Sequence, residues 1–377
     1  MKIGFVLDDS LDHPDGVQQY VLTLGRWYAS VGHDVHYLVG QTKRKDIKNI
    51  HSLSRNVAVR FNHNRLSIPL PTKRQRLRAL LRDEQFDILH VQMPYSPFLA
   101  GRIIAAAPDK TAVVGTFHII PYSNMERIGS RLLGWWLSRS LRRFDQVWSV
   151  SKPAQVFAQR SFGISSDILP NVVDCNALRP TSSTKTDANK SLSIVFLGRL
   201  VPRKGCRQLL EAARNLQAQP GTPPFQVIIA GDGPLRKSLE AYCVRSDLTQ
   251  IVTFRGFVSE REKAKLLSEA DIAVFPSLGG ESFGIVLIEA MAAGAGVVVG
   301  GDNPGYRSVL GAWPDCLVVP DDTSGFAAKL SRLLGEPQLR RRLHAAQQMA
   351  VAQYAVRVVG ERLLAEYQTV VAKRRRT

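Results

Sequence analysis

The chain has 377 residues, enough for about two domains, and 45% of them are hydrophobic, which excludes a wholly disordered chain. Lys and Arg outnumber Asp and Glu by 50 to 32, so the formal net charge is +18. This charge favours an anionic partner, such as a membrane leaflet, a nucleic acid or an acidic polymer, although a solvated basic face without a partner would give the same composition. The four cysteines are scattered without a C-x-x-C pair, so neither a zinc site nor a disulfide framework is indicated.

The first half of the chain alternates strand and helix patterns. Strands are predicted at Lys2–Leu7, Asp34–Val39, Phe86–Val91, Ala112–Phe117 and Gln146–Val150, and a helix at Gln18–Val31. Such alternation predicts parallel βαβ units, whose ligands bind at the carboxyl ends of the strands. The loops Asp8–Val17 and Thr116–Pro121 are therefore expected at one edge of the sheet.

The second half repeats this pattern after a polar segment, Pro170–Lys190, whose Pro, Ser and Thr content predicts a linker. Further strands are predicted at Ser193–Leu197, Gln226–Ala230, Ile251–Phe254, Asp271–Phe275, Gly296–Val299 and Cys316–Val319, and a last helix within Gln353–Ala372. We therefore expect an α/β protein of two doubly wound parallel-sheet domains with a seam near residue 171. The sequence has no run of about 18 apolar residues, so no membrane-spanning helix is expected. The start of the chain reads as a strand rather than a signal peptide, and a cytoplasmic protein is therefore expected.

Positive charge is concentrated between Lys43 and Arg82, where Asp46 is the only acidic residue. Two segments, Thr72–Arg82 and Met125–Arg143, have amphipathic spacing, and the second contains adjacent tryptophans. Aromatic residues beside cations suit a membrane interface, but tryptophans of a protein core would have the same spacing. The predicted membrane contacts are Lys73, Arg74, Arg76, Arg78, Trp135 and Trp136, which would hold the protein at the inner face of the plasma membrane.

The stretch Leu278–Gly296 (LGGESFGIVLIEAMAAGAG) predicts a glycine turn followed by a helix over Phe283–Ala293. Unpaired N–H groups at the start of such a helix can hold a phosphate. Glu281 lies beside that anion site and Glu289 lies about two helical turns deeper, where carboxylates can accept hydrogen bonds from sugar hydroxyls. A core helix with two incidental glutamates would show the same spacing.

A glycine-flanked basic loop, GRLVPRKG, follows the strand predicted at Ser193–Leu197 and contains Arg199, Arg203 and Lys204. Such cations can stabilise a leaving diphosphate, and the order of residues excludes a Walker loop. No D-x-D motif is present, so these cations rather than a metal ion are expected to neutralise the diphosphate. Gly231–Pro234 is predicted to be a structural turn.

Two residues in the first half are further candidates. His118 directly follows a predicted strand, which places it at the ligand-binding edge, although a lone histidine is more often a hydrogen-bonded structural residue. Gly16, in the loop Asp8–Val17, has no Cβ and would let the backbone approach a ligand, although a tight turn would explain it equally.

Taken together, GRLVPRKG, GDGP and GGESFGIVLIEAMAAG resemble the family-4 retaining glycosyltransferases of the GT-B fold, in which two Rossmann-like domains face a cleft. The E-x7-E pattern at Glu281 and Glu289 is the signature of that group. GTFHI at 115–119 and DGVQ at 15–18 also look like the phosphatidylinositol mannosyltransferases of actinobacterial envelopes.

This resemblance implies transfer of a hexose, mannose from GDP-mannose, to a membrane-lipid or polyol acceptor such as phosphatidylinositol, without cofactor or metal. It implies catalytic roles for His118, Glu281, Arg199 and Lys204, donor binding by Gly16, Val258, Phe283, Gly284, Ile285 and Glu289, and acceptor binding by Gln18, Asn62 and Arg65. It also implies an acceptor-binding domain over 1–171, completed by a returning C-terminal helix within 356–377, and a nucleotide-sugar-binding domain over 172–355.

The sequence departs from the family pattern at Asp15, where relatives have the first glycine of a Gly-Gly pair, and at Val172, where they read P-N-G-V-D. A glycosyltransferase that uses a UDP-sugar and a soluble or polysaccharide acceptor stays open as an alternative. So does a basic nucleic-acid-binding protein, although no recognised nucleic-acid-binding module is present.

Overall fold

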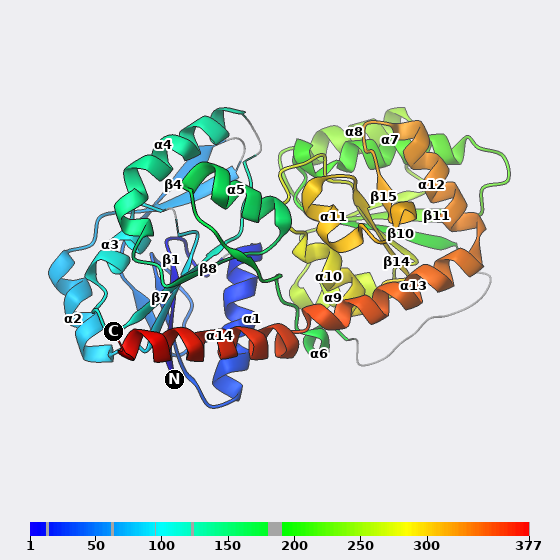
Figure 1. The fold of residues 1–377 in the computed structure, drawn as a ribbon. Coiled ribbons are helices and arrows are strands. Elements are labelled where there is room, and N and C mark those ends of the chain that lie inside the picture. Colours follow the sequence, from blue (N-terminus) through cyan, green and yellow to red (C-terminus); the bar gives the residue numbers. More distant parts are fainter. Residues whose placement is uncertain (13–14, 62–63, 95, 122–123, 180–190, 377) are drawn as a thin grey trace. The chain divides into compact units, whose positions relative to one another are not determined.

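The computed structural model describes the whole chain except residues 13–14, 62–63, 95, 122–123, 180–190 and 377, and except the side chains of residues 58–61, 64–68, 124–127 and 139. The described chain forms two compact units, each built on its own parallel sheet (Figure 1). Unit 1 consists of Met1–Val172 and Val356–Thr377, and unit 2 of Val173–Ala355. The seam expected near residue 171 thus falls between Val172 and Val173.

Unit 1 contains a seven-stranded sheet in the order β3-β2-β1-β6-β7-β8-β9, and its neighbouring strands are parallel. The strands are β1 (Lys2–Leu7), β2 (Asp34–Val39), β3 (Ile50–Ser52), β6 (Ile88–Gln92), β7 (Ala112–Phe117), β8 (Gln146–Ser149) and β9 (Asp167–Ile168). The helices are α1 (Gly16–Ser30), α2 (Arg74–Glu84), α3 (Leu99–Ala106), α4 (Asn124–Leu141), α5 (Lys152–Phe162) and α14 (Val356–Arg376). A separate antiparallel hairpin pairs β4 (Asn56–Phe61) with β5 (Asn64–Pro69). Parallel strands alternating with helices confirm the predicted doubly wound fold.

The sheet of unit 1 is covered by helices on both faces. Successive residues of a strand point to opposite sides, so one strand can contribute to two clusters. Phe5 of β1 packs in a cluster with residues of α1 and α14, whereas the next residue, Val6, packs in a cluster with residues of α2 and α3. A continuous apolar run is therefore needed in the central strands, and β6 and β7 are buried along their whole lengths.

Unit 2 contains a six-stranded parallel sheet in the order β12-β11-β10-β13-β14-β15. The strands are β10 (Leu192–Leu197), β11 (Phe225–Ala230), β12 (Val252–Gly256), β13 (Ile272–Phe275), β14 (Val297–Gly301) and β15 (Leu317–Val318). The helices are α6 (Cys175–Leu178), α7 (Cys206–Gln217), α8 (Arg236–Arg245), α9 (Glu260–Glu269), α10 (Ile285–Ala293), α11 (Pro304–Leu310), α12 (Thr323–Gly335) and α13 (Pro337–Val351). Each strand expected in this half of the chain overlaps an observed one, with ends that differ by one or two residues.

The segment predicted as a linker, Pro170–Lys190, contains the seam between the two units, but residues near its start are not solvated. Asn171, Val172 and Val173 are buried, and the N–H of Val173 donates to the carbonyl of Tyr354 over 2.9 Å. The carboxylate of Asp174 then accepts from the first N–H groups of α6 and begins that helix. One polar residue of this stretch, Asp174, therefore caps a helix, whereas Asn176 and Arg179 are exposed. Residues 180–190 lie outside the described chain.

The C-terminal helix α14, which the resemblance placed on the first domain, completes the core of unit 1 (Figure 1). The fully buried Tyr367 places its hydroxyl 2.5 Å from Nδ1 of His90, and Nε2 of His90 lies 2.7 Å from the hydroxyl of Thr116. The hydroxyl of Tyr28 donates to the carbonyl of Gly360 over 3.1 Å. Polar contacts as well as apolar packing therefore fix α14 to the sheet.

Replacing Tyr367 should separate these two contributions. Tyr367→Phe leaves the buried Nδ1 of His90 without its hydrogen-bond partner and should lower the free energy of unfolding by about 1–3 kcal/mol. Tyr367→Ala also leaves a cavity and should cost about 3–5 kcal/mol. Urea unfolding measures both, with the exposed Gln368→Ala on the same helix as a control expected within about 0.5 kcal/mol of wild type. A Tyr367→Phe variant as stable as wild type would show that the hydroxyl contributes nothing.

Candidate active site

The candidate site of unit 2 lies at the carboxyl ends of the neighbouring strands β10 and β13. The basic loop 198–205 follows β10, and the loop 276–284 follows β13. The two loops touch, since the N–H of Leu278 donates to the carbonyl of Arg203 over 2.9 Å. Gly205 has φ +71°, and a Cβ there would lie 1.8 Å from the carbonyl oxygen of Pro276, so only glycine permits this contact.

Glu281 is the centre of the cluster formed by these loops. Its Oε1 accepts hydrogen bonds from Nη1 of Arg203 over 2.8 Å, from Nζ of Lys204 over 2.7 Å and from the hydroxyl of Ser277 over 2.9 Å. Burial would raise the pKa of Glu281, but the charges of Lys204 and Arg203 outweigh burial and hold it below its usual value. Glu281 is therefore an ionised carboxylate between two cations. We call the four residues Glu281, Arg203, Lys204 and Ser277 the Glu281 cluster.

The cluster stands beside the first turn of α10. Gly284 precedes this helix with φ +103°, and a Cβ there would lie 2.6 Å from the ring of Tyr306. The helix thus begins at Ile285, two residues later than predicted, and the first N–H groups of a helix have no partner within it. Phe283 is 2% exposed and packs edge-on against the ring of Tyr354, so its side chain anchors the turn rather than facing a ligand.

Asn303, which sequence reasoning missed, holds this turn against β14. Its side-chain nitrogen donates to the carbonyl of Ser277 over 3.1 Å, and its Oδ1 accepts from the N–H of Tyr306 over 3.0 Å. A Cβ on Gly305 would lie 1.9 Å from the carbonyl oxygen of Glu281, so α11 and the Glu281 loop are in close contact. The signal that could have found Asn303 is its position before Pro304, since Asn followed by Pro is a typical start of a helix.

Glu289 lies in the second turn of α10 and pairs with a different cation. Its Oε1 accepts from Nζ of Lys263 over 2.9 Å, and Lys263 also contacts Glu260 over 2.7 Å. Burial raises the pKa of Glu289, and the charge of Lys263 only partly opposes this effect. Lys263 belongs to α9, which follows the half-buried Val258 closely in the chain. The structure thus connects the predicted donor residue Glu289 to the helix that begins next to Val258.

Arg199 lies at the same end of the sheet, exposed on the loop after β10. The neighbouring turn 231–234 packs on that loop, because the N–H of Leu200 donates to the carbonyl of Asp232 over 2.9 Å. Gly231 has φ +134°, and a Cβ there would lie 1.9 Å from the carbonyl oxygen of Gly198. The structural role predicted for this turn is confirmed. Of the three cations in the loop, Arg203 rather than Arg199 joins Lys204 at Glu281.

His118 of unit 1 is buried at the carboxyl end of β7. Its Nε2–H donates to Oε1 of Gln92 over 2.6 Å, and it forms a side-chain hydrogen bond with Asn171. Burial lowers the pKa of His118 to about 3, so the ring is neutral near pH 7. The histidine is hydrogen-bonded, as a structural histidine would be, and its role in transfer stays a prediction.

The other residues predicted for unit 1 are placed as follows. Gln18 is 3% exposed, and its amide nitrogen donates to the carbonyl of Ser10 over 3.2 Å, which fixes the loop after β1. Gly16 is exposed at the first position of α1, next to the exposed Asp15. Asn62 and the side chain of Arg65 lie outside the described residues. The acceptor role of Gln18 stays a prediction.

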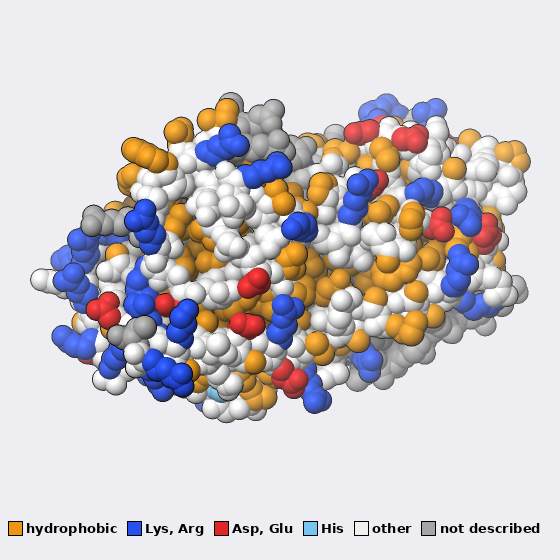
Figure 2. Space-filling view, in the orientation of Figure 1, with side chains coloured by type: hydrophobic (Ala, Val, Ile, Leu, Met, Phe, Trp, Pro, Cys, Tyr) orange, Lys and Arg blue, Asp and Glu red, His pale blue; other side chains and the backbone are white. Residues whose placement is uncertain are grey.

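The residues predicted to contact a membrane are on the surface. Lys73, Arg74, Arg76 and Arg78 are exposed, while Leu77 and Leu81 anchor α2 in the core. Trp135 and Trp136 are 81% and 66% exposed, so they are not core residues. Ile128 and Leu132 are also exposed and lie on the same side of α4, at helical spacing from Trp135 and Trp136. Figure 2 shows hydrophobic side chains gathered over α4 and Lys and Arg side chains gathered over α2.

None of the helices in the described part of the chain has the length and hydropathy that crossing a membrane requires.

Two Rossmann-like units are the architecture of the GT-B fold, and a cluster of cations beside a helix N-terminus is a site suited to a phosphate. The structure of Anabaena Alr3699/HepE in complex with UDP and glucose has this fold: it superposes with a TM-score of 0.75 at 17% identity, over 98% of this chain and 99% of that one.

Sequence comparison identifies the family. Residues 14–177 match the family model "Glycosyltransferase Family 4", and residues 179–349 match "Glycosyl transferases group 1". The phosphatidyl-myo-inositol mannosyltransferase of Mycolicibacterium smegmatis is 30% identical over 98% of this chain and 94% of that protein. The enzyme of the same name from Propionibacterium freudenreichii is 31% identical over 79% of this chain and 76% of its own length. The chain therefore belongs to the glycosyltransferase family that contains these mannosyltransferases.

The buried histidines of unit 1 should make the protein sensitive to acid. Burial lowers the pKa of His118 and of His90 to about 3, from 6.5, so the unfolded chain binds more protons than the folded chain between these values. The neutral histidines make their full contribution to the free energy of unfolding above pH 6.5. This free energy should fall on acidification, by up to about 1.4 kcal/mol per pH unit for each histidine.

Urea unfolding at pH 8, 7, 6 and 5, followed by tryptophan fluorescence, measures this effect. Trp27, Trp135, Trp136 and Trp148 lie in unit 1 and only Trp313 in unit 2, so the signal reports mainly on unit 1. His118→Gln should reduce the change in the free energy of unfolding between pH 6 and pH 5. The change between pH 8 and pH 7, where these histidines bind few protons, is the internal control. Equal stability of the wild type at pH 7 and 5 would contradict the assignment.

Proposed function

We propose that this glycosyltransferase transfers mannose from GDP-mannose to a phosphatidylinositol-type lipid at a membrane surface, with retention of the anomeric configuration and without a metal ion at the diphosphate. The observation that carries the proposal is the Glu281 cluster beside the first turn of α10. The names of the relatives support the acceptor and the sugar, and the UDP and glucose bound to Anabaena HepE support a nucleotide-sugar donor.

The charges of the cluster suit a diphosphate. Arg203 and Lys204 bring two positive charges against the single negative charge of Glu281, and a helix N-terminus adds about half a positive charge. This excess would neutralise the oxygens of the donor and the charge that develops on the leaving group. Arg199, exposed on the same loop, is a further cation for the diphosphate.

The carboxylates would then bind hydroxyl groups. Glu281 is ionised and held in place by its two cations, so it can accept hydrogen bonds from the hydroxyls of the sugar. Glu289, fixed by Lys263, would accept from the ribose, and Val258 would contact the base. The N–H groups of Gly284 and Ile285 would donate to phosphate oxygens.

The transfer itself would proceed on one face of the sugar. The bond between the anomeric carbon and the phosphate oxygen breaks, the acceptor hydroxyl forms a bond to that carbon from the same side, and the departing phosphate takes the hydroxyl proton. The products are GDP and the mannosylated lipid. A site with more cations than bases favours this path, because the leaving diphosphate supplies the base. The family resemblance would put His118, neutral near pH 7, against the transferred sugar. Its Nε2–H already donates to Gln92, so this contact would be made by the ring rather than by a hydrogen bond from Nε2.

Glu281→Ala should lower mannosyl transfer by at least about 100-fold. The sugar hydroxyls lose the carboxylate that accepts their hydrogen bonds, and the two cations lose the group that fixes their position. GDP should still bind, since Arg203, Lys204 and the α10 N-terminus remain. Radiolabel transfer from GDP-, UDP- and ADP-sugars to phosphatidylinositol, together with calorimetry of GDP binding, measures both effects. His118→Ala should likewise suppress transfer while retaining GDP binding.

The matched control is Glu240→Gln, which changes a half-exposed, ion-paired glutamate on α8 and should transfer like wild type. Wild-type transfer by Glu281→Ala or His118→Ala would remove the role assigned to that residue. Transfer to free inositol but not to phosphatidylinositol would favour the soluble-acceptor alternative.

The exposed faces of α2 and α4 would bring the enzyme to its lipid acceptor. Vesicles that contain phosphatidylinositol should bind the protein, and neutral vesicles should bind it much less. Each Lys or Arg near an anionic surface contributes about 1 kcal/mol, so the double variant Arg74→Gln/Arg78→Gln should bind about 30-fold more weakly. Trp135→Ser/Trp136→Ser should also bind more weakly, because its apolar face is lost.

Vesicle sedimentation measures this binding. Val244→Ser is the matched control, since Val244 is 69% exposed on α8 of unit 2 and should not affect binding. Equal binding to anionic and neutral vesicles would contradict the membrane proposal without affecting the donor site.

A further inference from the structure

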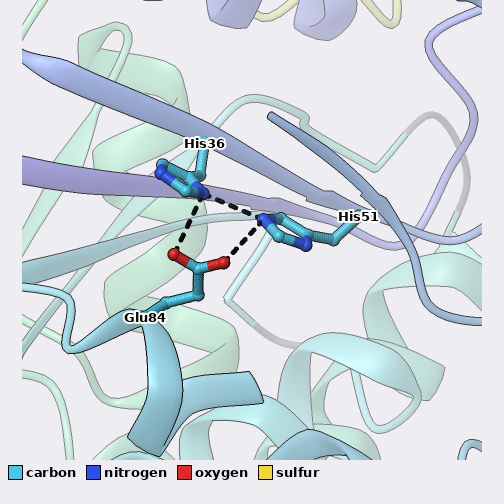
Figure 3. A group of neighbouring side chains, drawn as sticks. All are labelled: His36, His51 and Glu84. Atoms are coloured by element: carbon cyan, nitrogen blue, oxygen red, sulfur yellow. Dashed lines mark hydrogen bonds and ion pairs between the residues drawn. The ribbon is translucent and has the colours of Figure 1, made fainter. Parts of the chain in front are cut away.

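Two histidines and a glutamate meet at the edge of the unit 1 sheet. His36 comes from β2, His51 from the edge strand β3, and Glu84 is the last residue of α2 (Figure 3). Nδ1 of His36 lies 2.9 Å from Nε2 of His51 and 3.8 Å from Oε2 of Glu84, and Nε2 of His51 lies 3.9 Å from Oε1 of Glu84. One ligand atom from each side chain thus lies within 4.8 Å of the other two.

These separations are close to those that a metal ion requires. Zinc binds imidazole nitrogen and carboxylate oxygen at about 2.0–2.2 Å, so two ligands of a tetrahedral site lie about 3.3 Å apart. The observed 2.9, 3.8 and 3.9 Å lie on both sides of that value. The two distances to Glu84 involve different carboxylate oxygens, and the three ligand atoms lie within 4.8 Å of one another, so side-chain shifts of about 1 Å would bring one oxygen and both nitrogens around one ion.

The surrounding polar groups prepare His36 as a ligand. Nε2 of His36 lies 3.1 Å from Oδ1 of Asp34, and a carboxylate can only accept, so the ring proton is on Nε2. Nδ1 of His36 therefore presents its lone pair to His51 and Glu84. A carboxylate behind a histidine is the usual partner of a metal-binding imidazole, because it fixes the tautomer and the orientation of the ring.

His51 and Glu84 can complete the set. Without an ion, Nε2–H of His51 donates to Nδ1 of His36, and binding requires only that the His51 proton moves to its other nitrogen. Lys2 contacts Oε2 of Glu84 over 2.6 Å, and Oε1 points toward His51. The side chains of His36, His51 and Glu84 are 6%, 19% and 26% exposed, so an ion can enter from solvent.

We propose that His36, His51 and Glu84 bind one divalent transition metal ion, zinc by preference, with water as the fourth ligand and Asp34 as the positioning residue. Two imidazoles and one carboxylate suit zinc better than magnesium or calcium, which prefer oxygen. The ion would fasten the three-residue edge strand β3 and the end of α2 to β2. His36 and Asp34 lie in the amino-terminal half of β2, whereas the predicted substrate residues follow the carboxyl ends of strands, so the ion is structural and separate from the transfer reaction.

The test uses the full, tag-free chain, stripped with EDTA and dialysed against zinc chloride. Wild type should bind one equivalent of zinc and melt at a higher temperature with zinc than with EDTA. His51→Gln and His36→Ala should lose both effects. Asp34→Asn should bind zinc about 10–100-fold more weakly, because the ring of His36 is no longer fixed. Cobalt in place of zinc should give the absorption spectrum of a tetrahedral ion.

His33→Gln, which changes a histidine of the same unit outside the cluster, is the control and should bind like wild type. The melting temperature of each variant is first measured in EDTA, to check that it folds. His51 is partly exposed, so His51→Gln keeps the test valid if His36→Ala does not fold. Absence of stoichiometric binding in wild type, or binding unchanged in His51→Gln, would overturn the proposal and leave a hydrogen-bonded His–His–Glu cluster.

Discussion

The ionised carboxylate of Glu281, held between Arg203 and Lys204, is the interaction on which the donor site depends. Burial alone would favour the protonated form, and only the two nearby cations keep the charge. The same contact sets the positions of the cations and joins the loops after β10 and β13. A site of this kind carries fixed positive charge before any donor arrives, so little reorganisation is needed when a diphosphate binds.

Unit 1 is held together by a different set of buried polar contacts. Tyr367 on α14 pairs with His90, and Asn171, just before the seam, pairs with His118. Both histidines are neutral in the fold because burial disfavours their charged forms. The last helix is thus attached to the middle of β6 through His90, and the segment at the seam is attached through His118, just after the end of β7.

Helix α2 combines three functions in eleven residues. Leu77 and Leu81 anchor it in the core, the arginines between and around them face solvent, and Glu84 at its end joins His36 and His51. The spacing of an α-helix makes this possible, because residues three or four apart share a face while their neighbours point elsewhere. The proposed membrane surface and the proposed metal site therefore share one rigid element.

The sequence by itself determined the two doubly wound sheets, the family and the glycines of the donor site, because these depend on local periodicity and on backbone conformations that only glycine adopts. It did not identify Lys263 or Asn303, and it named Arg203 as a cation for the diphosphate without predicting its contact with Glu281, since these two residues are 78 positions apart and meet only because β10 and β13 are neighbours. Nor did it decide that Trp135 and Trp136 are exposed, that Asn171–Val173 are buried, or that His36, His51 and Glu84 converge. Tertiary structure decided these, because helical spacing shows which residues share a face but not whether that face meets protein or water.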